Sequence, residues 1–412
     1  MLNIRWLPRR QHLSLSYTLN TKLNFHSLSQ PKVDEFDDFL PWLKRKAGAD
    51  ISSALSIGKS AYGTSLFASK SITAGDCVLK VPYSVQLASD NLVPELKDLL
   101  SDEVGDAAKL AAVVLLEQRM GNDSGWAPYI RRLPCPEEMH CTIFWSDDEL
   151  ELIRQSSVYQ ETINQRSQIE KEFLAIRMAL KNFPEMFKSI TYKDFMHTYG
   201  LVTSRAWGST KGYSLVLIRY GKFSNATLLL DFGFTHSYNI HDQVQIQGNI
   251  PHDDVLREMK WELLKRHHRP ISNDVNCFDS SMDSFTIKEV RSGSGKGKGI
   301  PQSLRAFARV LCCTSPQELS DLAKEAAEHD GRLARRPLTN SSREIKAHQM
   351  LVSKLTRLAE DYDASIMSLG LVSSPITCGR LHIRRQMARD LLNGELRILK
   401  SASAWLRNYC DP

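Results

Sequence analysis

Cysteines are the first residues whose spacing could support chemistry, as zinc ligands, redox pairs or disulfides. No two of them form a C-x-x-C pair, and no Cys/His cluster has the spacing of zinc ligands. Scattered cysteines in a chain of 412 residues are typical of reduced thiols in a reducing compartment, so no metal is expected. The eight cysteines are Cys77, Cys135, Cys141, Cys277, Cys312, Cys313, Cys378 and Cys410.

A glycine-rich stretch at residues 291–299 could hold phosphate groups, because such loops present backbone N–H groups to anions. The stretch fails the phosphate-loop pattern, since Gly299 stands where a Ser or Thr should follow Lys298. A flexible connection between domains is the favoured interpretation.

Three longer strings carry the strongest pattern in the chain. The first, residues 60–82, contains the glycine turn Tyr62-Gly63-Thr64 and ends in ITAGDCVLKVP. The second is VTSRAW at residues 202–207. The third is IRYGKFSNATLLLDFGF at residues 218–234.

In this order the strings resemble the Rubisco-methyltransferase branch of SET-domain proteins. The first is similar to the opening of a SET domain, the second to the S-R-A-[FW] string of the branch, and the third to its Y-G-x-x-S-N-A…[YF]-G-F ending. Residues 126–134 and 143–146 resemble the helical insert that splits the SET fold in this branch, and residues 285–370 resemble its helical substrate-binding domain. Longer plant-type members, with the string at 303–310, are the most similar.

The resemblance implies methyl transfer from S-adenosylmethionine to a protein side chain, usually lysine. It places the cofactor against Tyr62, Gly63 and Thr64, where a glycine allows close approach. It pairs the Arg205 guanidinium with the carboxylate of the cofactor. Tyr220 takes the catalytic position beside the cofactor, where a hydroxyl orients the reactants.

The resemblance also implies a substrate channel that contains Ser204 and Phe232. An aromatic channel that excludes water lowers the pKa of an acceptor lysine and holds its stem. Many members carry a tyrosine where Phe232 stands, so this chain keeps the aromatic wall and lacks one hydroxyl. The acceptor type, lysine or histidine, and the number of methyl groups transferred are therefore left open.

The chain departs from the family pattern between Arg205 and Tyr220, which are only about fifteen residues apart. Family members carry an Asn-His pair there, after a P-x-x-D-x-x-N-H run, in a threaded crossing of strands that completes the cofactor pocket. Here residues 214–218 lead directly into Arg219 and Tyr220 without that pair. A natural isoform that omits an exon or an error in the gene model would each produce this join, and either leaves the cofactor site incomplete.

Short strands and one turn are expected around the first and third strings. Residues 65–68 and 78–81 have strand composition and are separated by a turn at 73–76. Strand composition returns at 214–218 and 228–234. We expect these strands to form the β part of the fold.

Helices are expected over most of the remaining chain, as periodicity and capping residues indicate. The segment with Pro128 and Pro134 is predicted to be a packed, non-helical linker. The predicted helices cover 34–42 and 107–120, begin after Ser146 and after Ser315, and extend over 345–370 and 382–405.

The length of the apolar runs and the distribution of charge each argue against one class of function. The longest purely apolar runs, such as residues 111–116, are far shorter than the ~20 residues of a membrane span. The net charge of +6 comes mostly from residues 1–32, which contain five basic residues and no acid, so a nucleic-acid-binding face has little support. The serine-rich, basic start is typical of an organelle transit peptide. Its composition does not separate a plastid from a mitochondrial address, and the plant-type resemblance implies a plastid, with a mitochondrion as the second choice.

These observations predict an α+β protein: a split SET β-fold with a helical insert and a mainly helical C-terminal domain. The expected domains are a transit peptide (1–32), a SET domain (33–239, insert at about 90–198, shortened near 218), a substrate-binding domain (240–370) and a basic amphipathic tail helix (371–412).

The predicted function is protein-lysine N-methylation in an organelle, with S-adenosylmethionine as cofactor and a protein as substrate. A monomer is expected, and neither nucleic acid nor a membrane is an expected partner. The alternatives are a protein that binds a partner without transferring a methyl group, and an unstable splice product.

Overall fold

The computed structural model describes most of the chain from residue 39 onward. Tyr62, Tyr220, the join at 218–220 and the expected transit peptide lie outside the described residues. The described ranges are 39–48, 55–60, 63–68, 70–73, 76, 80–82, 85–89, 92, 98, 100, 104–181, 189–206, 213–215, 222–267, 276–279, 281–290, 298–328, 330–370 and 379–410.

The chain divides into two compact units. Unit 1 contains residues 1–138 and 169–219, and unit 2 contains residues 139–168 and 220–412. The boundary at 168–169 falls inside helix α6 (Ser157–Leu180). Each unit is therefore built from segments that are far apart in the sequence.

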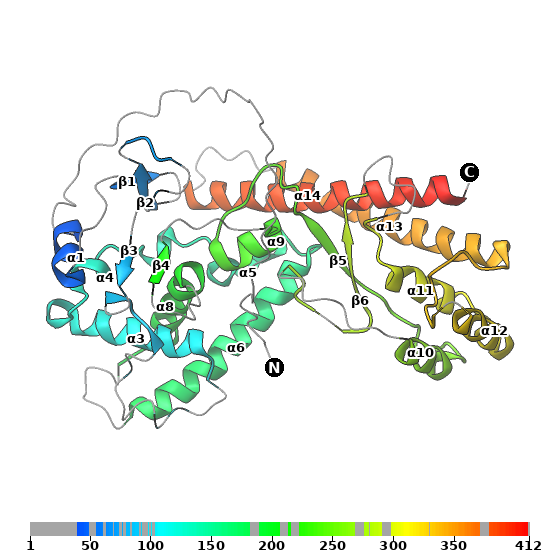
Figure 1. The fold of residues 1–412 in the computed structure, drawn as a ribbon, viewed down its shortest axis with the longest axis horizontal. Helices are drawn as coiled ribbons and strands as arrows, with labels where there is room; N and C mark the ends of the chain where they lie inside the picture. Colours follow the sequence, from blue (N-terminus) through cyan, green and yellow to red (C-terminus); the bar gives the residue numbers. More distant parts are fainter. Residues whose placement is uncertain are drawn as a thin grey trace. The chain divides into compact units, whose positions relative to one another are not determined.

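Unit 1 combines two small antiparallel sheets with helices (Figure 1). Strand β1 (Leu55–Ser60) pairs with β2 (Gly63–Ala68), and β3 (Lys80–Pro82) pairs with β4 (Tyr213–Leu215). The helices are α1 (Phe39–Ala47), α3 (Asp106–Met120), α4 (Ala127–Ile130) and α8 (Tyr192–Arg205), with short 3₁₀ turns η3 (Gly121–Asp123) and η4 (Pro136–Glu138).

The predicted linker at 126–134 is wrong in one respect, because it contains the one-turn helix α4. Proline is tolerated in the first turn of a helix, where its missing N–H needs no partner, and Pro128 occupies such a position. Helix α1 packs on α4, with the Phe39 and Tyr129 rings 6.2 Å apart and Lys46 Nζ 4.0 Å from the centre of the Trp126 ring.

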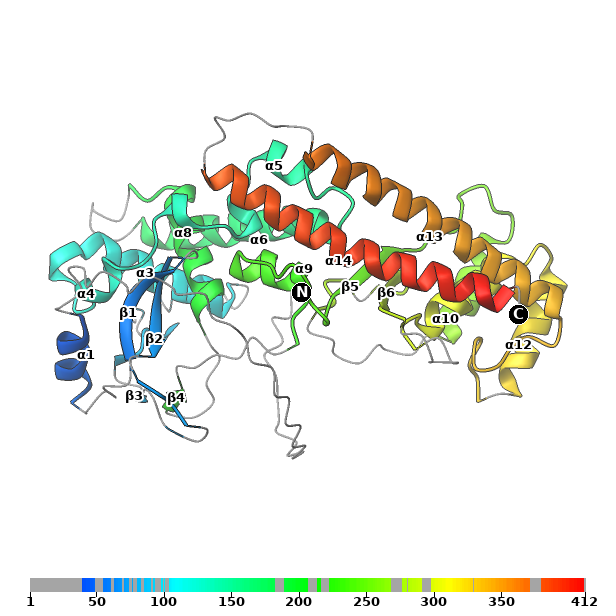
Figure 2. The same ribbon diagram turned by 90° about the horizontal axis from the view of Figure 1, so that it is seen from above.

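Unit 2 is mainly helical and contains one further antiparallel pair, β5 (Gln243–Gln247) with β6 (Ser284–Lys288). The long helices α13 (Ser341–Gly370) and α14 (Gly379–Cys410) lie side by side (Figure 2), and their apolar faces form much of the core. The shorter elements are η5 (Thr142–Phe144), α5 (Asp147–Glu151), α9 (Asn225–Thr227), η6 (Leu228–Phe232), α10 (Arg257–Arg266), α11 (Gln302–Leu311) and α12 (Pro316–Ala327).

Several helix starts follow the capping residues of the sequence. Ser315 Oγ accepts a hydrogen bond from the Glu318 N–H and begins α12. The helix predicted to begin after Ser146 is present, and a capping box of Ser146 and Glu149 begins it, but it is the five-residue helix α5. The chain turns after α5, and Ser156 Oγ accepts from the Val158 N–H at the start of α6.

The strand predicted at 228–234 is wrong, because residues 228–232 form the π-helical turn η6. Ser224 Oγ accepts a hydrogen bond from the Thr227 N–H and begins a helix in which three leucines follow. An apolar run of this length is compatible with a buried strand or a buried helical turn, so periodicity cannot separate the two. All three leucines of the run are buried.

A buried ion pair joins α14 to the segment that precedes α6. The Arg384 guanidinium lies 2.5 Å from Glu149 Oε2 and also donates to the carbonyl oxygens of Met139 and Phe144, at 2.9 and 3.1 Å. Arg384 is fully buried, at 0% exposure. Removing the cation would leave a buried carboxylate and two buried carbonyl groups without this donor.

We therefore predict that Arg384→Met lowers the free energy of unfolding of unit 2 by about 3–5 kcal/mol, the usual cost of breaking a buried ion pair. Urea denaturation followed by circular dichroism measures the change. The exposed Arg380 on the same helix provides the matched control Arg380→Met, which should change stability by less than about 0.5 kcal/mol. Equal effects of the two substitutions would contradict this role of Arg384.

Candidate functional site

The first predicted cofactor residues lie at the start of strand β2. Gly63 pairs with Ser60 and Thr64 pairs with Lys59 in the β1–β2 hairpin, and Tyr62 lies outside the described residues. Only the backbone of Gly63 and Thr64 is described. A strand that starts with glycine allows another molecule to approach its backbone closely.

Ser204 and Arg205 are the last two residues of α8, a helix that begins with a capping box of Thr191 and Asp194. Ser204 Oγ donates to the Gly200 carbonyl oxygen at 2.7 Å and accepts from Arg205 Nη1 at 2.7 Å. Arg205 is exposed. The structure thus joins these two predicted site residues directly, and the serine hydroxyl orients one nitrogen of the guanidinium.

Tyr129 lies within electrostatic range of Arg205. Burial raises the pKa of Tyr129, and the positive charge of Arg205 opposes part of that increase in pKa. The phenol is therefore neutral and its ring packs against Phe39. In unit 1, the described site residues are Gly63, Thr64, Ser204 and Arg205.

Phe232, the predicted channel residue, belongs to unit 2 and ends η6. Its ring centre lies 5.7 Å from that of Phe223, with 36° between the ring planes, and both residues are half-buried. The chain leaves η6 at Gly233, whose φ is +73°. A Cβ at Gly233 would meet the Cys141 backbone nitrogen at 2.7 Å, so glycine is required there.

The Ser-Asn-Ala part of the third string is buried in a polar network. The Asn225 N–H donates to Asp242 Oδ1 at 2.8 Å, and the Asn225 side chain exchanges two hydrogen bonds with the His236 backbone. Burial raises the pKa of Asp242 to about 6, although the hydrogen bond from Asn225 and the charge of Arg397 lower that pKa.

Two further carboxyl groups of unit 2 have strongly raised pKa values. Burial raises the pKa of Glu395 on α14 to about 8, and its oxygens accept from the hydroxyls of Tyr362 (2.8 Å) and Ser156 (2.9 Å). Burial, together with the nearby Glu161 carboxylate, raises the pKa of Asp231 to about 7. These groups hold protons near neutral pH.

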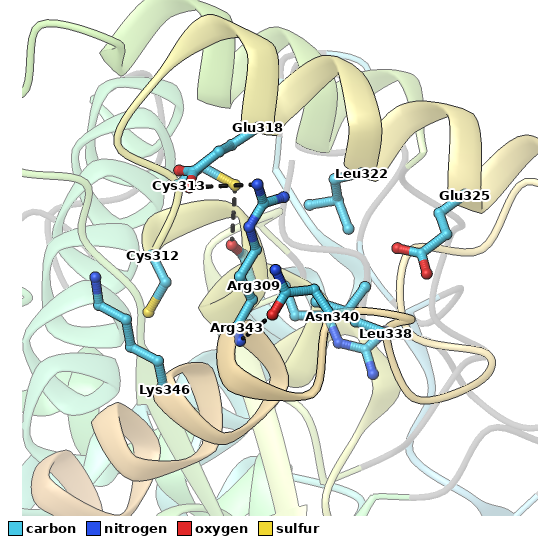
Figure 3. A pocket seen from close by; sticks show the side chains of 10 residues that line it. All are labelled: Arg309, Cys312, Cys313, Glu318, Leu322, Glu325, Leu338, Asn340, Arg343 and Lys346. Carbon is cyan, nitrogen blue, oxygen red and sulfur yellow. Dashed lines mark hydrogen bonds and ion pairs between the residues drawn. The ribbon is translucent and has the colours of Figure 1, made fainter.

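A cleft lies between α11, α12 and α13 (Figure 3), and none of the predicted site residues lines it. Arg343 forms an ion pair with Glu318 at 3.4 Å. Burial and the Glu318 carboxylate raise the pKa of Cys313 to about 11, so that thiol is not a nucleophile near neutral pH. The cleft residues are Arg309, Cys312, Cys313, Glu318, Leu322, Glu325, Leu338, Asn340, Arg343 and Lys346.

Among the described ranges, no three His, Cys, Asp or Glu side chains are grouped in a way that could hold a metal ion. Within the same ranges, no helix combines the length and hydrophobicity that a membrane span requires.

Residues 251–399 match the family model of the Rubisco LSMT substrate-binding domain. The C-terminal part of this chain is therefore similar to the Rubisco LSMT substrate-binding domain. The matched range contains strand β6, helices α10 to α13 and most of α14. The resemblance that the sequence strings indicated is confirmed for this domain.

Solved structures of Rubisco LSMT have the same fold as the chain. The structure of Rubisco LSMT bound to AdoMet superposes with a TM-score of 0.67 at 17% identity, over 91% of this chain and 92% of that one. The SET domain of LSMT bound to MeLysine and AdoHcy gives a TM-score of 0.68 at 19% identity, with the same coverage. The predicted α+β fold, a SET fold with an additional helical domain, is confirmed.

Two kinds of curated relative are similar in sequence. The actin-histidine N-methyltransferase of Homo sapiens is 24% identical over 459 residues, which cover 96% of this chain and 70% of that protein. The chloroplastic ribulose-1,5 bisphosphate carboxylase/oxygenase large subunit N-methyltransferase of Nicotiana tabacum is 24% identical over 230 residues, which cover 53% and 45% of the two chains.

Sequence reasoning missed the polar residues that surround the third string, namely Asn239, Asp242 and Asn276. Each lies in a loop among other polar residues, and such residues are usually solvated. All three are buried. The one feature of the sequence that could have indicated a structural role is the position of Asp242 directly before the strand β5.

The buried acid Glu395 makes stability depend on pH. Its folded-state pKa of about 8 lies above the value of about 4.3 for an exposed glutamate, so the folded state binds more protons between these pH values. The free energy of unfolding must then fall as pH rises from about 4.5 to about 8, by up to about 1.4 kcal/mol per pH unit. Glu395→Gln should reduce this slope between pH 6 and pH 8.

Urea denaturation at several pH values measures the slope. Glu360 on α13 is exposed, so the control Glu360→Gln should leave the slope unchanged. Asp231 and Asp242 also titrate near this range, so part of the slope should remain, but a slope that is not reduced at all in Glu395→Gln would contradict the role of Glu395.

Proposed function

We propose that this chain is an S-adenosylmethionine-dependent protein N-methyltransferase whose acceptor is a lysine side chain. The observation that carries the proposal is the fold, which matches LSMT structures bound to AdoMet and to MeLysine over 91% of the chain. The substrate-binding domain at 251–399 supports a protein as the substrate.

The cofactor would be held by residues of unit 1. Arg205 presents an exposed guanidinium at the end of α8, with one nitrogen oriented by Ser204, which suits a bidentate pair with the carboxylate of the cofactor. Gly63 and Thr64, with Tyr62 before them, would support its remaining atoms. Bound S-adenosylmethionine supplies an electrophilic methyl group on a sulfonium centre.

The acceptor would be held by aromatic side chains of unit 2. A lysine must lose its proton before its nitrogen can attack a methyl group, and a channel that excludes water lowers the lysine pKa. Phe232, which is half-buried, offers an apolar wall for the lysine stem. Tyr220 would orient the amine and the methyl group through its hydroxyl.

A histidine acceptor is the second candidate. The share of this chain that aligns with its relatives supports this candidate. Relatives named actin-histidine N-methyltransferase align with 96% of this chain, whereas the Rubisco-type relative aligns with 53%. Phe232 lacks the hydroxyl that a tyrosine would place in the channel. Mass spectrometry of the methylated residue separates the two acceptors.

We also propose that the missing Asn-His segment impairs the chain as it stands. Without that segment, Arg205 is the one predicted ionic contact to the cofactor, and an exposed ion pair contributes only ~0–1 kcal/mol. A micromolar dissociation constant requires a binding free energy of about −8 kcal/mol. Unit 2 has its own core, so a protein that binds a partner without transferring a methyl group is the alternative activity.

We predict that this 412-residue chain shows no measurable S-adenosylmethionine binding in isothermal titration. A version with a P-x-x-D-x-x-N-H run inserted between Ile218 and Arg219 should bind it with micromolar affinity and methylate a protein substrate. In that version, Tyr220→Phe should reduce turnover by about 10²-fold, because one hydroxyl is lost from the reacting centre.

Micromolar binding by the original chain would overturn the proposed impairment and leave the methyltransferase proposal intact. An inserted version that binds the cofactor but modifies no lysine or histidine of candidate proteins would overturn the methyltransferase proposal. Unchanged turnover in Tyr220→Phe would assign Tyr220 a packing role.

A plastid protein is the proposed class of substrate, since the chain starts with a serine-rich, basic segment and one relative is chloroplastic. We predict that residues 1–32 fused to a fluorescent protein direct it to plastids in plant cells. The control carries Arg9→Glu and Arg10→Glu and should stay diffuse. Mitochondrial fluorescence would change the compartment, and diffuse fluorescence of the parent fusion would remove the targeting role.

A further inference from the structure

Four backbone groups at residues 222–225 form hydrogen bonds with side chains from other parts of unit 2. They are the carbonyl oxygens of Lys222 and Phe223 and the N–H groups of Ser224 and Asn225. Backbone groups outside helices and strands usually bond to water or to near neighbours. Here three side chains, Asn239, Asp242 and Asn276, hold the chain between Tyr220 and η6. We call them the polar clamp.

Asn276 forms the most extensive contact of the polar clamp. Its Nδ2 donates to the Lys222 carbonyl oxygen at 2.9 Å, and its Oδ1 accepts from the Ser224 N–H at 2.7 Å. The Oδ1 also accepts from Thr227 Oγ1 at 3.1 Å. One carboxamide thus fixes both sides of Phe223, which requires a donor and an acceptor on the same side chain.

Asn239 and Asp242 hold the two following positions. Asn239 Nδ2 donates to the Phe223 carbonyl oxygen at 2.9 Å, and Asp242 accepts from the Asn225 N–H at 2.8 Å. Both side chains come from the loop before β5, and both are at most 7% exposed.

Helix α14 supports the polar clamp from the other side. Arg397 Nη2 donates to the Asn239 carbonyl oxygen at 2.9 Å and lies 3.6 Å from Asp242 Oδ2. A Cβ at Gly394 would overlap with the same Asp242 oxygen, so glycine is needed where that carboxylate meets the helix. The residues that match the Rubisco LSMT substrate-binding domain, 251–399, thus include Asn276 of the clamp as well as the two α14 residues that contact Asn239 and Asp242.

We propose that Asn239, Asp242 and Asn276 are positioning residues for the Phe223–Phe232 ring pair, and that Phe223 is a second wall of the acceptor channel. The inference rests on the proposed function, which places Phe232 in that channel. The clamp fixes the backbone on both sides of Phe223, and the Phe223 ring contacts Phe232. Half-buried rings at this spacing leave aromatic surface for an alkyl stem or a cation.

Asn276→Asp tests the proposal, because it keeps the shape and the acceptor oxygen but replaces the donor to the Lys222 carbonyl oxygen with a second oxygen, which is negatively charged when ionised. The full chain carries 4-fluorophenylalanine at position 232, and its fluorine resonance reports the surroundings of the ring. We expect the resonance to shift or broaden in Asn276→Asp and in Asn239→Asp. The exposed Asn249 provides the control Asn249→Asp, which should leave the fluorine resonance unchanged.

Melting temperatures measured in parallel separate a local change at the ring pair from unfolding. If Asn276→Asp does not fold, Asn239→Asp tests the same positioning role. In the version with the inserted segment, Asn276→Asp and Phe223→Ala should each lower kcat/KM for the protein substrate by about tenfold and leave the Kd for S-adenosylmethionine unchanged.

An unchanged fluorine resonance in both Asp variants would overturn the positioning role. Unchanged kcat/KM in Phe223→Ala would overturn the channel role of Phe223. If the inserted version itself transfers no methyl group, the proposed function fails, and the fluorine resonance still decides whether these residues position the ring pair.

Discussion

Unit 2 depends on the buried guanidinium of Arg384. A cation that has lost its water needs partners inside the protein, and both terminal nitrogens of Arg384 find them in one carboxylate and two carbonyl oxygens from residues 139–149. Its carboxylate partner, Glu149, also completes the capping box of α5 by accepting from the Ser146 N–H. Helix α14 is consequently attached to a segment more than two hundred positions earlier in the sequence.

Because α14 is fixed in this way, its other residues can reach the candidate site. Glu395 receives hydrogen bonds from Ser156 and Tyr362, which ties α14 to the start of α6 and to α13. One turn of the same helix presents Gly394 and Arg397 to the polar clamp. The substrate-binding domain and the segment that leads to Phe232 thus belong to one packed unit, so a change in one can alter the geometry of the other.

Local chemistry made parts of the fold predictable. The N-caps at Ser146 and Ser315 and the apolar spacing in α13 act over a few residues, so they were visible in the sequence. The segment at 228–234 was predicted as a strand because three leucines have no period of their own, and tertiary burial decided for a π-helical turn. The one-turn helix at Pro128 was missed because proline weakens helix predictions even where the first turn accepts it.

The sequence by itself determined the family resemblance, the α+β fold and the predicted site residues, since motifs such as Ser204-Arg205 are contiguous in the chain. Only the tertiary structure decided that Ser204 orients Arg205, that Phe223 pairs with Phe232, and that Asp242 lies against Gly394. The physical reason is that burial depends on contacts between distant residues. An asparagine or aspartate in a loop has the same local pattern whether water surrounds it or a folded chain does, and its role is fixed only when that chain packs around it.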